Sequence, residues 1–227
     1  DLVLLDVMMP RMNGFVACEF GRFDESVPEI VTADFSEKLF FPYRKYHLGD
    51  YKLFVREYAR GLVRSSRMPK MTDLVKENII DSLGELFSNA KTHSGSSAGV
   101  FVCGQYLPDR KLIVFSIADA GMGFSERLRE SKNRFFGDVA AIDWAMTSWN
   151  SARTGVNPGG GGLKLLRNFI ELNSGSIQIV SRNGYWELRS GQVAMSNLPF
   201  EFPGTIVTIS VNTEDRQSYC MKSESIN

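Results

Sequence analysis

The chain has 227 residues, of which 43% are hydrophobic and 23% are charged, as in an ordinary globular protein. Its 26 basic and 26 acidic residues leave no net charge, which excludes the strongly basic character typical of proteins that bind nucleic acid or anionic membranes. The sequence shows no apolar run of transmembrane length and no secretory leader, and its three cysteines lack metal-ligand spacing. We therefore expect a cytoplasmic protein without a nucleic-acid or membrane partner.

The first part of the chain predicts a strand and a turn. The apolar run from Leu2 to Met9 stops at Pro10, and Asn13-Gly14 favours the positive φ of a turn. Residues 16 to 36 carry mixed signals. We therefore place a boundary between residues 25 and 45 and treat residues 1–35 as a separate segment.

Helical spacing of apolar residues begins at Asp50. A first helix is expected to end near Ser65-Ser66, and we interpret residues 36–69 as a helical lead-in. A second helix is expected to begin with Thr72 as its N-cap and to stop at Ser94-Gly95. Its apolar face is expected to consist of Leu74, Val75, Ile79, Leu83, Leu86, Phe87 and Ala90.

The rest of the chain alternates strands with helices. Strands are expected over residues 99–107, 111–118, 176–181, 184–190 and 205–211, helices over 124–147 and 163–173, and a glycine-rich loop over 148–162. Asn183-Gly184 is a strong signal for a hairpin turn. This order predicts an α/β fold with one mixed sheet and helices on one face, followed by a disordered polar tail over residues 213–227.

Three short motifs carry candidate chemistry, and the first lies on the second helix. Glu85 and Asn89 are four residues apart and therefore share a helix face. A carboxylate beside a carboxamide oxygen suits a hydrated Mg²⁺ ion, and the carboxylate can also orient a water molecule as a general base. The alternative is a solvated polar pair on a helix surface.

The second motif follows an apolar strand and consists of Asp119, Gly121 and Gly123. An aspartate at the end of a strand can accept a hydrogen bond from an exocyclic amine, and glycines let the backbone approach a flat ring closely. The alternative is an Asx turn that only ends the strand.

The third motif is a glycine run that opens a helix. It contains Gly160, Gly161 and Gly162 and is followed by Leu163 and Lys164. Backbone amides at the positive end of a helix form an anion site, to which a lysine can add a cation. The alternatives are a flexible linker and a lysine that faces solvent.

Together the three motifs resemble the GHKL ATPases, a family that includes gyrases, heat-shock chaperones and histidine kinases. The first motif is similar to the N box of the family, and the other two are similar to its two glycine boxes. A closing strand motif is matched by Gly204-Thr205 with Thr208. The resemblance covers residues 70–212, which we treat as one ATP-binding domain.

The resemblance implies a two-layer α/β sandwich of the Bergerat type, with ATP and Mg²⁺ between the helices and the sheet. It implies that Asp119 binds the adenine amino group, that Asn89 and Glu85 hold Mg²⁺, and that Glu85 is the general base. Residues 124–158 would form a mobile lid. Lys164 replaces a third glycine found in many kinases of the family, which puts turnover in doubt more than nucleotide binding. The remaining implied nucleotide contacts are Gly121, Gly123, Gly160, Gly161, Gly162, Leu163, Lys164 and Thr205.

The stretch from Leu2 to Phe15 resembles the phosphoacceptor strand and following turn of a response-regulator receiver domain, in which Asp6 would accept phosphate. The acidic pair with which a receiver holds Mg²⁺ has no counterpart in this sequence. We therefore interpret residues 1–35 as an incomplete, receiver-like remnant and expect that Asp6 is not phosphorylated.

These resemblances predict a signalling protein whose histidine-kinase-like domain binds Mg-ATP and transfers phosphate to a partner protein. The chain has two histidines, His47 and His93, and neither has the context of a phosphoacceptor. The expected acceptor is therefore a separate protein, as for serine kinases of the anti-sigma type. The alternatives are an ATP-hydrolysing conformational switch and a non-enzymatic, nucleotide-gated interaction module. Self-association into a homodimer is left open.

Overall fold

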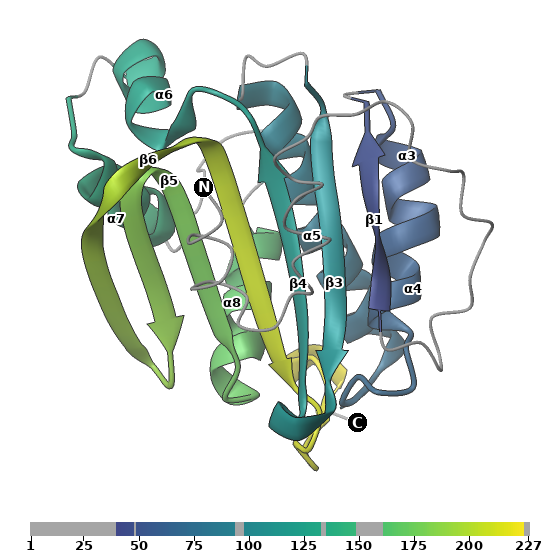
Figure 1. The fold of residues 1–227 in the computed structure, drawn as a ribbon. Coiled ribbons are helices and arrows are strands. Elements are labelled where there is room, and N and C mark those ends of the chain that lie inside the picture. The colour runs from purple at the N-terminus through teal and green to yellow at the C-terminus, as the bar shows by residue number, and fades with distance from the viewer. Residues whose placement is uncertain (1–39, 48, 94–97, 133–134, 149–160, 225–227) are drawn as a thin grey trace. The chain divides into compact units, whose positions relative to one another are not determined.

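The computed structural model describes residues 40–47, 49–93, 98–132, 135–148 and 161–224 (Figure 1). The chain divides into two units between Ala33 and Asp34, and the described residues all belong to the second. The receiver-like segment over residues 1–35, and Asp6 with it, lies outside the described residues.

The framework of the described unit is a five-stranded antiparallel sheet of order β1-β3-β4-β6-β5. Its strands are β1 (Phe40–Tyr46), β3 (Val100–Leu107), β4 (Leu112–Asp119), β5 (Ser176–Arg189) and β6 (Gln192–Asn212). The prediction of a mixed sheet is wrong for this part of the chain, because each neighbouring pair is antiparallel. The strands joined through helices, β4 and β5, do run in the same direction, but β6 lies between them.

Helices pack on one face of this sheet. Helix α5 (Asp73–His93) lies beside α8 (Gly161–Leu172), and both are behind the sheet in Figure 1, as are α3 (Tyr51–Phe54) and α4 (Arg60–Val63). A π-helical turn over Val55–Ala59 joins the last two. The remaining helices are α6 (Gly123–Lys132) and α7 (Asp138–Ser148), with short 3-10 turns at Pro108–Arg110 and Lys222–Glu224. The fold is therefore α/β, with an antiparallel sheet covered by helices.

The core between the helices and the sheet explains why the helix predictions were accurate. Thr72 caps α5 as expected, because its Oγ1 accepts a hydrogen bond of 3.3 Å from the N–H of Val75. The apolar stripe of α5 is buried against the sheet, except for Leu74, which is 44% exposed and was wrongly assigned to it. Among the described residues, no helix is both long enough and apolar enough to span a bilayer.

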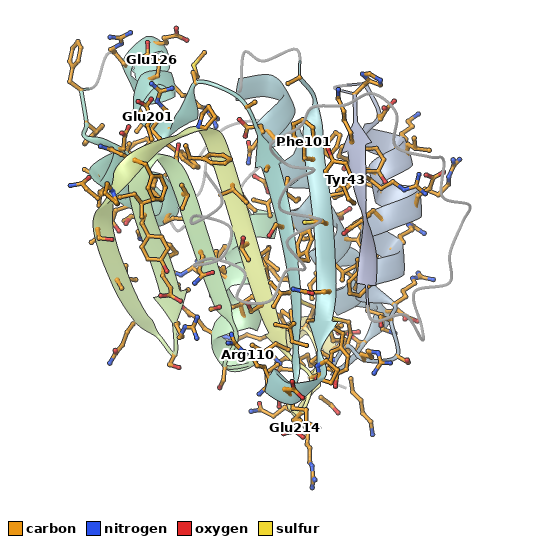
Figure 2. The ribbon with its side chains drawn as sticks, in the orientation of Figure 1. Tyr43, Phe101, Arg110, Glu126, Glu201 and Glu214 are labelled. Carbon is orange, nitrogen blue, oxygen red and sulfur yellow. The ribbon has the colours of Figure 1, made fainter. Side chains whose placement is uncertain are left out.

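The helical lead-in expected over residues 36–69 contains a strand that was not predicted. β1 pairs with β3 across a register shift between Phe41 and Arg44, and Tyr43 stacks on Phe101 of β3 at 6.3 Å (Figure 2). A proline within the strand conceals it in the sequence, because proline is compatible only with edge strands and bulges.

The hairpin turn predicted at Asn183-Gly184 is also wrong. β5 continues through this dipeptide as a bulge, with Arg182 at a φ of 56°, and the turn lies instead at Ser190-Gly191. Gly184 has a different role: a Cβ there would lie 2.8 Å from the carbonyl carbon of Asp138 at the start of α7. Beyond the bulge, β5 and the first half of β6 form a two-stranded ribbon over residues 184–197.

The tail expected to be disordered over residues 213–227 is ordered from residue 213 to residue 224. Within it, β7 (Ser218–Tyr219) pairs in parallel with β2 (Lys70–Met71). The Tyr219 ring packs at 5.0 Å on Phe169, and its hydroxyl donates to the carboxylate of Asp215. A buried aromatic side chain therefore anchors a segment whose average composition is polar.

The packing of Gly184 leads to a stability prediction. Gly184→Ala should lower the free energy of unfolding by about 1–3 kcal/mol, because the added methyl group must displace the backbone of α7. Urea denaturation measures the change. Gly49→Ala is the matched control, because a Cβ at Gly49 meets no atom within 4 Å. Equal stability of the two variants would contradict the described packing.

Candidate functional site

The candidate site lies at one end of the helix-facing side of the sheet. Alternate residues of each strand face the helices, and on the neighbouring strands β4, β6 and β5 these residues are apolar until the last position of their common register. That last position is Asp119 on β4, Thr205 on β6 and Ser181 on β5, and the three are neighbours in register. We call these three residues the polar row, which lies at the end of an otherwise apolar sheet face.

The carboxylate of Asp119 is buried, with only 9% of the residue exposed. The backbone N–H of Gly121 donates to its Oδ1 at 2.9 Å, and the backbone N–H of Thr205 is a second donor. The hydroxyls of Ser181 and Thr205 lie 3.1 Å apart, and Ser181 also accepts from the N–H of Phe124 at 3.0 Å. The aspartate is thus held in place by the loop that follows it and by the adjacent strand.

Burial has an electrostatic consequence for this carboxylate. Desolvation raises the pKa of Asp119 to about 6, against the opposing effects of the backbone hydrogen bonds from Gly121 and Thr205 and of the positive charge of Arg127. An ionisable group with a strongly shifted pKa at the end of a sheet is a candidate for ligand binding.

Two glycines permit the close packing around Asp119. Gly204 has a φ of +137°, and a Cβ there would lie 2.0 Å from the carbonyl oxygen of Asp119. Gly123 has a φ of +78°, and its Cβ would lie 2.7 Å from the Oγ of Ser181. Both positions therefore need glycine for backbone geometry and for space. Gly121, in contrast, contributes its amide to the Asp119 carboxylate.

The direction of α8 brings its N-terminus to the same end of the sheet as Asp119. Asn173, just after α8, exchanges hydrogen bonds of 2.9 and 2.6 Å with the backbone of Asn212. Because Asn212 pairs with Leu112, the C-terminus of α8 lies at the opposite end of β4 from Asp119. Gly161 and Gly162 therefore begin α8 on the Asp119 side.

Helix α5 runs in the opposite direction to α8. Its C-terminal half, which carries Asn89, therefore lies on the Asp119 side of the sheet. Its cap residue Thr72 donates its backbone N–H to the carbonyl of Tyr219 at 3.0 Å. The Tyr219 hydroxyl is bonded to Asp215, which Asn173 contacts at 3.0 Å at the Leu112 end of the sheet. Glu85 and Asn89 lie late in α5 and are both partly buried.

The remaining sequence predictions have mixed outcomes. Gly160 lies outside the described residues, and Lys164 is exposed in the first turn of α8. Leu163 is only 1% exposed and belongs to the core. Thr208 is on the opposite face of the sheet from Thr205, where its hydroxyl pairs with that of Ser116 at 2.8 Å. Thr208 is therefore not part of the polar row.

Helix α7 lies within the segment that was expected to form a mobile lid over residues 124–158. Ile142 and Met146 of this helix are fully buried, and Asp143 accepts a hydrogen bond of 3.1 Å from the indole of Trp186 on β5. The apolar side of α7 packs on the ribbon, which fixes the helix in the fold.

Sequence reasoning missed Ser181, although a signal for it exists. It follows Ile177 and Ile179 at steps of two residues, and period-two counting along β5 places it on the helix-facing side. Within the part of the chain that the structure describes, no three His, Cys, Asp or Glu residues gather as metal ligands.

In comparisons with known proteins, no protein-family model and no curated protein sequence matches this chain. The interpretation of the site therefore rests on its geometry.

The raised pKa of Asp119 leads to a prediction about stability and pH. Between about pH 4 and pH 6 the folded state holds a proton that the unfolded state has lost, so the contribution of Asp119 to stability decreases as the pH rises through this window. Asp119→Asn should therefore be more stable relative to the wild type at pH 7 than at pH 4. The expected change in relative stability is on the order of 1–3 kcal/mol.

Urea denaturation at a series of pH values measures this change. Asp81→Asn is the matched control, because it makes the same substitution at an exposed position of α5. Parallel stability profiles for the wild type and Asp119→Asn would contradict the burial of a charged Asp119.

Proposed function

We propose that the described unit binds an adenine nucleotide with Mg²⁺ in the manner of the GHKL ATPases and has their Bergerat-type sandwich fold. The observation that carries the proposal is the buried Asp119 carboxylate, which ends the helix-facing side of the sheet at the end where α8 begins. A buried carboxylate lowers stability unless a partner compensates for the lost hydration. A ligand with an amino group is such a partner.

The hydrogen-bonding capacity of Asp119 supports adenine as the base that is bound. The exocyclic amine of adenine can donate to the carboxylate, whose position is fixed by the amide of Gly121. The hydroxyls of Thr205 and Ser181 continue the polar row beside it. Guanine presents a carbonyl oxygen at the corresponding ring position, and this oxygen would face the ionised carboxylate. The proposed site therefore favours adenine.

The phosphates would extend from Asp119 toward the N-terminus of α8. Gly161 and Gly162 begin α8, whose first-turn amides would bind the phosphates, and the helix dipole adds positive potential there. Lys164 is exposed in the same turn and can supply a cation. Asn89 and Glu85 would hold Mg²⁺, which would neutralise the negative charge of the phosphates.

Glu85 is the proposed general base for transfer to a protein partner. Its carboxylate would accept the proton of an incoming hydroxyl while the hydroxyl oxygen bonds to the γ-phosphorus and the bond to the β,γ-bridging oxygen breaks. Kinase activity is the reaction that we propose, and hydrolysis by water or nucleotide binding alone are the alternatives that the experiments below separate.

Nucleotide binding is tested first by calorimetry with Mg-ATP and Mg-GTP. The wild type should bind Mg-ATP, and Asp119→Asn should weaken binding by about 10–100-fold, the cost of losing a hydrogen bond to a charged group. Asp81→Asn carries the same change of charge on the exposed surface of α5 and should bind as the wild type does. A wild-type protein that binds no adenine nucleotide would refute the proposal.

The role of Glu85 is tested separately from binding. Glu85→Gln should still bind Mg-ATP, but more weakly than the wild type because a proposed Mg²⁺ ligand loses its charge. At saturating Mg-ATP it should lose phosphate transfer and phosphate release. Glu130→Gln, at an exposed position of α6, serves as the control. Labelled phosphate on an added protein would indicate a kinase, and free phosphate alone an ATPase. Binding without either product would leave a nucleotide-gated module, and unchanged turnover in Glu85→Gln would exclude Glu85 as the base.

A further inference from the structure

The ribbon formed by β5 and β6 has an open backbone edge. Between Gly184 and Arg189, β5 pairs with residues 192–197 of β6 in an uninterrupted register. On its other side, this half of β6 pairs with none of the strands that the structure describes, because β4 joins β6 only from Thr205 onward. Figure 1 shows this half of β6 at the left margin of the fold. We call the backbone of residues 192–198 on this side the open edge.

The register shows which backbone groups point outward from the open edge. Ser190 and Gly191 have φ values of 50° and 72°, as in a two-residue type I′ turn, whose flanking residues bond to each other. Arg189 and Gln192 are therefore a hydrogen-bonded pair, and hydrogen-bonded and non-bonded pairs alternate from there. The N–H and C=O groups of Val193, Met195 and Asn197 consequently point away from β5.

The open edge lacks the features with which proteins usually prevent strand pairing. Residues 192–198 contain no charged side chain and no proline, whereas edge strands are commonly protected by lysine, proline or bulges. β1, at the other margin of the sheet, carries such residues in Pro42, Arg44 and Lys45. The open edge also exposes apolar side chains, since Val193 is 42% and Met195 is 49% exposed.

We propose that the open edge pairs with the same edge of a second copy of this chain. In an antiparallel pairing, the outward-pointing residues of one copy form hydrogen bonds with those of the other. Only one register pairs all three of these residues, Val193, Met195 and Asn197. In it Met195 lies opposite Met195 of the other copy, and Val193 lies opposite Asn197. A twofold axis passes through the Met195 pair, and the two ribbons form one continuous sheet.

Two features of the open edge, its lack of charged side chains and its complete use in a twofold pairing, favour a second copy of this chain over a foreign peptide. The self-pairing brings no like charges together, because the open edge has none. It apposes the exposed Met195 side chains of both copies, which removes apolar surface from water. Pro199 then ends the pairing segment, since proline has no N–H for a ladder. Each edge is used once, so the pairing closes at a dimer.

Self-association is measured by sedimentation velocity over a range of concentrations of the full chain. The wild type should form a concentration-dependent dimer. Met195→Lys and Met195→Glu should each weaken the dimer by about ten-fold or more, because like charges then face each other on the axis. An equimolar mixture of the two variants should restore dimerisation, because opposite charges meet at the same position. This restoration is specific to a residue that faces its own copy.

Ser190→Lys and Ser190→Glu are the matched controls, because they place the same charges in the exposed turn of the same ribbon, away from the open edge. They should associate as the wild type does. Circular dichroism and thermal unfolding verify that each variant is folded. A wild type that stays monomeric, a dimer that survives in both Met195 variants, or a mixture of folded Met195 variants that stays monomeric would each overturn the proposal. The test is independent of nucleotide binding.

Discussion

The organisation of the candidate site depends on keeping the Asp119 carboxylate buried at the end of an apolar sheet face. The register of β4 with β6 places Thr205 beside it, and the backbone of Gly204 packs directly on the Asp119 carbonyl. Two backbone amides and two hydroxyls surround the site. Burial of the carboxylate raises the energy of its ionised state and raises its pKa to about 6, although the backbone amides of Gly121 and Thr205 oppose this shift. Natural proteins accept such a cost chiefly where a group has a function.

The glycines of the site have distinct physical roles. Gly123 and Gly204 occupy backbone conformations and spaces that exclude a side chain, so they determine the shape of the loops around Asp119. Gly161 and Gly162 instead begin a helix whose first turn is at the same end of the sheet. The glycines of the sequence motifs therefore differ in what they do: Gly123 and Gly204 permit close packing around Asp119, and Gly161 and Gly162 begin helix α8.

The sequence predicted those elements in which apolar residues follow a helical period or form a continuous run that is buried on both faces of a strand. Helix α5 and strands β3 and β4 have clear apolar patterns, and Asp119 is recognisable as the residue that ends one of them. The first half of β6 was missed because both of its faces are exposed, which removes the alternation on which strand prediction relies. Gly184 was misread because the atoms that require a glycine belong to α7, far away in the sequence. Which groups converge at the site depends on the opposite directions of α5 and α8, and local patterns do not contain that information.

The short parallel pair of β2 and β7 also constrains how this fold is reached during synthesis. β2 directly precedes α5, and its only partner among the described strands is β7, which is followed by little more than one described turn. On the ribosome, the start of α5 therefore lacks this partner until almost all of the described chain has emerged. Domains made from such long-range pairings fold slowly. The start of the helix that carries Glu85 and Asn89 can therefore gain this contact only after β7 has been synthesised.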